Sequence, residues 1–259
     1  MMVRMLSGRR ANQVMQRIDR PEAVALAVAL ALLAAVGWYV APFWLAVIVA
    51  AQLTMAGLGG VHLIGPARPG MGFARYATLA TAAVALTLFG RLLPGGVALL
   101  LVPVVAVLLW SVLWLELRAA RGIGARTMLD LAMAGILFAG ASGIWALLGQ
   151  GAWPPPLVLV LLLAFVLAMR SAEDRGWGGI EAVGQATLHV LAVGQVGAAL
   201  VLLHLPGMVS PAIVALTFHA WGGAVEALQE GASLRSVALE FGTLGVLGLI
   251  VALLLQQPA

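Results

Sequence analysis

The strongest constraint on this chain is a succession of apolar runs, separated by short segments rich in proline, glycine and arginine. A helix of about 20 apolar residues can cross the hydrocarbon core of a bilayer, which is about 30 Å thick, and it satisfies its own backbone hydrogen bonds. The pattern therefore predicts an all-α integral membrane protein, a polytopic bundle of about nine transmembrane helices. These are expected near residues 22–40, 43–64, 73–93, 96–117, 128–149, 155–170, 181–205, 209–229 and 234–256.

Composition supports this class, because 63% of the 259 residues are hydrophobic and only 9% are charged. A soluble domain usually has about a quarter of its residues charged. Nine helices with short connections would form a single transmembrane domain over residues 21–259, with little chain left for a soluble catalytic domain. The run at 155–170 is short, and an eight-helix alternative would treat it as a re-entrant segment.

The arginines predict the orientation. If the N-terminus is cytoplasmic, all of the 14 arginines except Arg91 fall in segments on the inner side, as the positive-inside rule requires. The expected location is the plasma (inner) membrane, with the C-terminus outside. Residues 1–20 are basic and are expected to form either an amphipathic helix at the interface or a loosely ordered leader.

Missing residue types exclude several kinds of chemistry. The chain has no cysteine, which excludes disulfides, thiolate nucleophiles and thiolate-bound metals. All of its fixed positive side-chain charges are arginines, so a lysine Schiff base is also excluded. The arginines are divided among short loops rather than gathered in one stripe, and we therefore expect no nucleic-acid partner.

Polar side chains inside membrane helices are costly, and they mark the candidate site. The last three predicted helices are consecutive, are expected to be neighbours, and could line one pocket open to the cytoplasm. The residues assigned to this candidate polar pocket are His189, Gln195, His219, Glu226 and Glu240.

Three functional interpretations of this set remain open. Imidazole and carboxylate groups can bind a divalent metal, buried carboxylates can relay protons, and histidines can ligate a haem or chlorin-type pigment. The alternative is that the groups satisfy one another by hydrogen bonds between helices. None of the spacings is diagnostic, so no metal or cofactor is assigned.

Gly242, Gly245 and Gly248 recur at intervals of three on the last predicted helix. Small residues let helix backbones approach closely in lipid, and these glycines are candidates for packing within the bundle or against a partner protein or second copy. Together these features predict a carrier of a small or lipidic substrate, or an accessory subunit of a membrane complex. The alternative is an intramembrane enzyme that acts on a lipid or isoprenoid at the cytoplasmic face.

Overall fold

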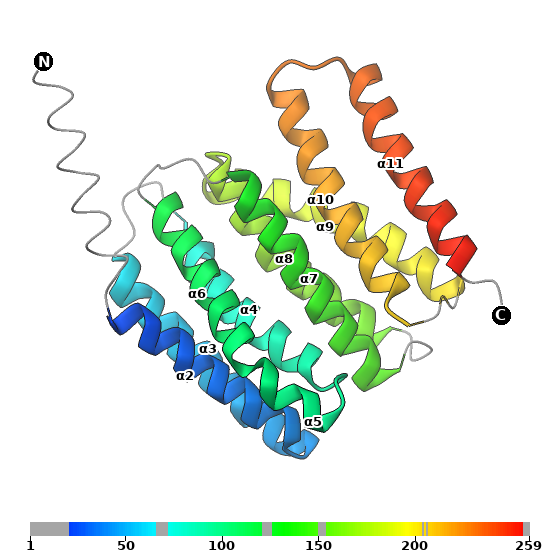
Figure 1. Cartoon of the computed structure of the whole chain (residues 1–259). Coiled ribbons are helices and arrows are strands. Elements are labelled where there is room, and N and C mark those ends of the chain that lie inside the picture. The colour runs from blue at the N-terminus through cyan, green and yellow to red at the C-terminus, as the bar shows by residue number, and fades with distance from the viewer. Residues whose placement is uncertain are drawn as a thin grey trace, which may run out of the picture.

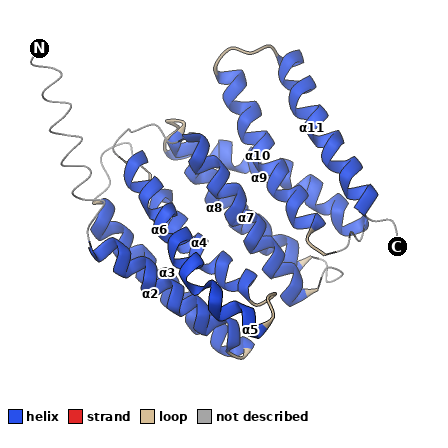
Figure 2. Ribbon diagram, in the orientation of Figure 1, coloured by secondary structure: helices blue, strands red, loops and turns tan. Residues whose placement is uncertain are grey.

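The computed structural model describes residues 21–65, 72–120, 126–149, 154–203, 205 and 207–255. Throughout these segments the regular structure is helical and no strand occurs (Figure 2). The predicted basic segment at residues 1–20 lies outside the described residues. The helices are α2 (Pro21–Tyr39), α3 (Pro42–Ile64), α4 (Ala74–Gly90), α5 (Gly95–Ala98), the 3-10 helix η1 (Leu99–Leu101), α6 (Val102–Ala119), α7 (Arg126–Leu148), α8 (Pro155–Asp174), α9 (Gly179–Leu203), α10 (Val209–Gln229) and α11 (Leu234–Leu255).

All nine predicted apolar runs are helical, the run at 96–117 being divided among α5, η1 and α6, but the count of membrane spans needs correction. Within the described segments, seven helices are long and apolar enough to cross a membrane, rather than nine. The two that fall outside this group are α4 and α11. With 17 residues, α4 is about 25 Å long, which is shorter than a hydrocarbon core.

For the run at 155–170 the sequence allows either a membrane span or a re-entrant segment. In the structure this run is part of a helix long enough to span. This helix, α8, continues beyond Arg170 through Ser171 to Asp174 and has 20 residues. The sequence predicts that the span ends at residue 170, where the hydropathy falls, whereas the helix continues through the charged residues that follow. Proline is the first residue of α2, α3 and α8, which agrees with the predicted starts of these helices. Proline suits this position because backbone N–H groups in the first turn have no partner within the helix, so its missing N–H costs nothing.

The centre of the bundle is α4, which packs against α2, α3, α6, α7 and α8. Figure 1 shows α2 and α3 along one side of the molecule and the α10–α11 pair along the other. Small residues allow the central helices to approach closely. A Cβ added to Gly143 of α7 would lie 2.5 Å from the backbone carbon of Leu88 on α4.

Large apolar side chains cover much of the outer surface. Leu58 on α3 is 69% exposed, and Leu202 at the end of α9 is 78% exposed. A water-soluble protein rarely shows so much contiguous apolar surface, whereas lipid tails solvate it well. The seven long apolar helices and this outer surface indicate a multi-pass membrane protein.

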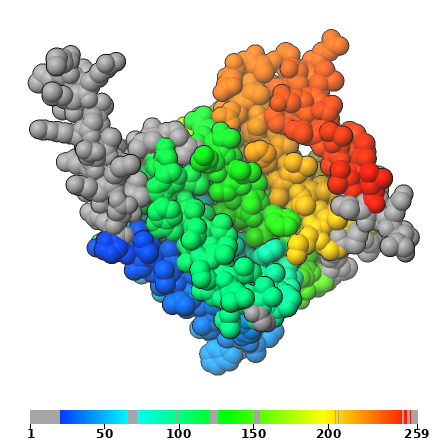
Figure 3. All heavy atoms as spheres, viewed as in Figure 1, coloured from blue at the N-terminus to red at the C-terminus, as the bar shows by residue number. Residues whose placement is uncertain are grey.

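The α10–α11 pair forms one edge of the molecule, coloured orange and red in Figure 3. Its outermost member, α11, packs chiefly against α10. An apolar groove of about 560 Å³ lies between α7, α10 and α11, with Phe138, Leu216 and Leu247 among its lining residues. The edge is therefore less tightly integrated than the helices around α4.

Candidate functional site

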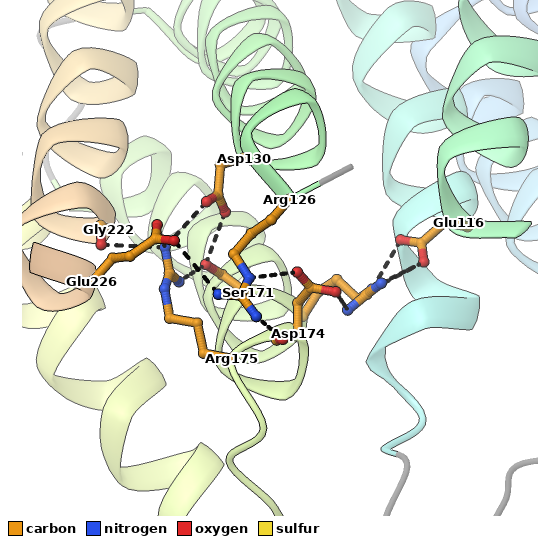
Figure 4. Close-up of polar contacts among 9 residues, drawn as sticks. Glu116, Arg126, Asp130, Ser171, Asp174, Arg175, Gly222 and Glu226 are labelled. Carbon is orange, nitrogen blue, oxygen red and sulfur yellow. Dashed lines mark hydrogen bonds and ion pairs between the residues drawn. The ribbon is translucent and has the colours of Figure 1, made fainter. Parts of the chain in front are cut away.

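Charged side chains from four helices meet at one end of the bundle (Figure 4). The ends of α6, α8 and α10 and the start of α7 lie together there, because successive helices run in opposite directions. The contacts form an unbroken chain in which carboxylates and guanidinium groups alternate. In order, its members are Glu116, Arg170, Asp174, Arg126, Glu226, Arg175 and Asp130.

The first link, between Glu116 of α6 and Arg170 of α8, is deeply buried. The side chains are 1% and 6% exposed, respectively. Arg170 Nε donates to both carboxylate oxygens of Glu116, at 2.9 and 3.0 Å, and Arg170 Nη2 donates to Oε2 at 2.8 Å. Such forked geometry makes the strongest kind of protein ion pair, and it links α6 to α8.

The middle links are longer and more accessible to solvent. Arg170 Nη1 lies 3.5 Å from Asp174 Oδ1, one turn further along α8. Arg126, at the start of α7, lies 3.4 Å from Asp174 through Nε and 3.5 Å from Glu226 of α10 through Nη1. Since the Arg126 side chain is 47% exposed, these pairs hold their helices less firmly than the Glu116–Arg170 pair.

Arg175, just after α8, ties α7 and α10 together. Its Nη2 donates to Asp130 Oδ2 and to the backbone oxygen of Gly222, each at 3.2 Å, and lies 3.9 Å from Glu226. Its Nη1 donates to Ser171 Oγ, which donates to Asp130 Oδ1 at 3.2 Å. The Arg175 side chain is only 5% exposed, so this cation lies within the protein and close to several acceptors.

A further carboxylate beside this chain positions α4. Glu173 Oε1 accepts a hydrogen bond from the backbone N–H of Ala74, at 3.2 Å, and so satisfies a donor at the start of α4. The carboxyl group lies directly against Gly72, where an added Cβ would overlap it. Glycine at position 72 therefore lets α8 cap α4.

A small polar cavity adjoins the chain of charges, with space for about one water molecule. It lies between α8, α9 and α10 and the Trp177 segment that joins α8 to α9. Its lining residues are Ala168, Ala172, Arg175, Trp177, Gln185, His189, Trp221, Gly222 and Val225.

His189 lies in the wall of this cavity and is 5% exposed. Its Nε2 is 2.9 Å from the backbone oxygen of Phe218, and the two rings stack with centroids 4.2 Å apart. A carbonyl oxygen only accepts hydrogen bonds, so Nε2 must carry the proton that it donates. This bond fixes the imidazole between α9 and α10.

The structure brings together only part of the predicted polar pocket. His189 lines the cavity, and Glu226 belongs to the neighbouring chain of charges. Gln195, His219 and Glu240 lie on exposed faces of α9, α10 and α11, respectively. Nowhere in the described residues do three or more His, Asp or Glu side chains gather in a way that could hold a metal ion.

The three glycines of α11 differ in their surroundings. A Cβ added to Gly242 or Gly245 would meet nothing within 4 Å, whereas one added to Gly248 would lie 3.0 Å from Leu216 Cδ2 of α10. Gly248 therefore packs within the bundle. Gly242 and Gly245 face open space.

Sequence reasoning missed most of the charge chain, because it assigned those arginines to loops and to topology. The available signal was helical spacing. Arg126 and Asp130 are four residues apart, as are Arg170 and Asp174, and this spacing places each pair on one helix face. Opposite charges at this spacing near the end of a helix are candidates for an interhelical network.

Comparison with known proteins finds no matching family model, no similar curated protein and no similar solved structure. The function proposed below therefore follows from the geometry of this end of the bundle.

Proposed function

We propose that the protein is a carrier of a small or lipidic substrate in the plasma (inner) membrane, with the N-terminus and the charge chain on the cytoplasmic side. In this proposal α4 and α11 also cross the membrane, and the C-terminus is outside. The arginine distribution supports the orientation, since the arginines of the charge chain lie at the end that the positive-inside rule assigns to the cytoplasm.

The observation that carries the proposal is the chain of alternating charges beside a polar cavity. The whole sequence has ten acidic residues, and four of them belong to this chain. Apolar side chains of similar volume often replace a buried ion pair such as Glu116–Arg170 without loss of stability, so stability alone does not require these charges. Ionisable groups that are kept within a membrane protein commonly line the path of a substrate or ion.

The links to α10 are suited to opening. Glu226 is the only carboxylate of the chain contributed by α10, and its distances to Arg126 and Arg175 are 3.5 and 3.9 Å. These contacts are looser than the Glu116–Arg170 pair, and the Glu226 side chain is 31% exposed. We infer that α10 moves away from α7 and α8 when Glu226 releases the arginines, and that this movement opens the cavity to the cytoplasm.

The absence of native cysteine allows a direct test. Ala168 lines the cavity and is 1% exposed, so a single Ala168→Cys replacement reports access to it. In a carrier, some molecules are open to one side of the membrane and the others to the opposite side. We therefore expect a membrane-impermeant maleimide to label this thiol whichever side it is added to. Adding Glu226→Gln should increase labelling from the cytoplasmic side at least severalfold and reduce labelling from outside.

Glu230→Gln is the matched control, since Glu230 lies one turn further along on an exposed position. It should leave both labelling rates unchanged. If Ala168→Cys reacts from one side only, and Glu226→Gln alters neither rate in a folded protein, the carrier proposal is wrong.

The second candidate function, an accessory subunit of a membrane complex, has its own observation. Gly242 and Gly245 face open space on a helix that packs chiefly against α10, which suits contact with another transmembrane helix. Native mass spectrometry in mild detergent distinguishes the two, because a subunit would co-migrate with other chains. An intramembrane enzyme has less support, since His219 and Glu240 lie on exposed faces away from the cavity.

A further inference from the structure

Two buried hydrogen-bond donors beside the cavity have no acceptor among the described residues. They are Arg175 Nε and Trp177 Nε1. The other two guanidinium nitrogens of Arg175 are engaged by Ser171, Asp130 and the Gly222 carbonyl. Buried donors in folded proteins are almost always paired, because an unpaired one loses its hydrogen bonds to water without replacement.

Arg175 and Trp177 line the same cavity, and the charge there favours an acceptor that is negative. Arg175 is the only charged side chain in the described lining. The carboxylates that balance it, Asp130 and Glu226, contact Nη2 and are not part of the lining. The polar side chains in the lining are therefore a guanidinium, an indole, the Gln185 amide and the His189 imidazole, and no carboxylate is among them.

The size of the cavity limits what can enter. Space for about one water molecule is also space for one oxygen atom of a larger acid group. Gly222 keeps this space open, since an added Cβ would lie 3.1 Å from Arg175 Nη2 and 3.8 Å from His189 Cε1. Trp221, which also lines the cavity, is 37% exposed, so the rest of a ligand can remain at the surface beside an aromatic ring.

We propose that this cavity binds one oxygen of a phosphate or carboxylate group, with Arg175 Nε and Trp177 Nε1 as its donors. This inference rests on the proposed carrier function and names its substrate class, which is an acid or an acidic lipid. An oxyanion at Nε and the Glu226 carboxylate would then compete for the single positive charge of Arg175. It would thereby weaken the longest ion pair that holds α10.

The test uses the full-length protein and two probes that separate the possible sources of the acid group. Inorganic phosphate is titrated into protein in a neutral detergent, and protein in phosphatidylcholine bilayers is compared with protein in bilayers that also contain phosphatidylglycerol. Thermal unfolding reports binding, because a ligand of the folded state raises the midpoint. Stabilisation by free phosphate indicates a soluble acid, and stabilisation by phosphatidylglycerol alone indicates a lipid headgroup.

Variants assign the effect to the cavity. Trp177→Phe removes the indole N–H but keeps a ring, and Gly222→Ala fills the space beside Arg175. Trp177→Phe should weaken binding of the effective probe about tenfold or more, which is the usual consequence of losing a hydrogen bond to a charged group, and Gly222→Ala should weaken it by occupying the space that the oxygen needs. Trp114→Phe makes the same chemical change as Trp177→Phe on α6, outside the cavity, and should have no effect on binding.

The site is refuted if neither probe stabilises the protein, or if Trp177→Phe and Gly222→Ala bind as tightly as the parent. The cavity would then hold no more than a water molecule. Failure of the carrier proposal is recognised separately. In that case the probe binds and its binding is weakened by Trp177→Phe, yet the Ala168→Cys thiol is labelled from one side only and Glu226→Gln does not change its labelling rate.

Discussion

Glu116 and Arg170 show how costly charge is accommodated inside this bundle. Each would be unfavourable alone in a low-dielectric interior, and their forked contact offsets the loss of hydration. Removing one partner leaves the other buried without compensation. Removing both leaves neither charge, so the two kinds of variant should behave very differently.

We expect Glu116→Leu to lower the free energy of unfolding by about 3–5 kcal/mol, because it leaves the Arg170 guanidinium buried with only the longer contact to Asp174. The double variant Glu116→Leu with Arg170→Met should recover most of this loss. Reversible unfolding in mixed micelles measures both. A double variant as unstable as the single one would mean that the pair has no compensating role.

Histidine positions show why the sequence predicted only part of the site. His189 and His219 both lie within apolar helices, yet one is buried and the other is exposed. In a soluble helix, polar residues mark the outer face. A membrane helix is apolar on all sides, so hydropathy does not reveal which side faces its neighbours, and the inward residues could not be distinguished from the outward ones.

The α4–α7 contact brings two helix backbones close together, and it depends on one glycine. Close approach of backbones gives membrane helices much of their attraction. Lipid tails are as apolar as leucine side chains, so the hydrophobic effect does not drive the helices together. Gly143 supplies this approach against Leu88 of α4. A side chain at this position would have to displace backbone.

Gly143→Ala should therefore lower stability by about 1–3 kcal/mol, the usual cost of overpacking a close contact. Gly135→Ala is the matched control on the same helix, because its added Cβ meets nothing within 4 Å, and it should be neutral or slightly stabilising. Thermal unfolding of the two variants in the same detergent compares them. Equal midpoints would show that α4 and α7 separate at little cost.

Helix positions were more predictable than their functional contacts. Proline and glycine between the apolar runs marked the connections, and all nine runs proved to be helices. The end of α8 was missed because Arg170, Glu173 and Asp174 interrupt the hydropathy while still continuing the helix. Their charges are satisfied by partners on α4, α6 and α7, which a single run of sequence does not contain.

The number of crossings determines on which side the C-terminus lies. Phe73 and Gly95 flank α4, and single cysteines at these positions should be labelled from opposite sides, Phe73→Cys from the cytoplasm. Ala232→Cys, before α11, should be labelled from the cytoplasm, and a reporter fused to the C-terminus should be active outside. Labelling of Phe73→Cys and Gly95→Cys from the same side would show that α4 does not cross.

Gly178→Cys and Met208→Cys provide the control, because they flank α9, one of the seven helices that are long and apolar enough to span. These two thiols should always be labelled from opposite sides. If they are not, the labelling reagent has crossed the membrane and the α4 and α11 results have no meaning.

The two sides of the molecule are held by forces that respond differently to the surrounding solution. Around α4 the helices are held by close packing, whereas the end of α10 that carries Glu226 is held in addition by an ion pair with the partly exposed Arg126. Dissolved salt screens exposed charges but leaves van der Waals packing unchanged. We therefore expect raised ionic strength to weaken the ion pair between Glu226 and Arg126, while the contact between Gly143 and Leu88 stays unchanged.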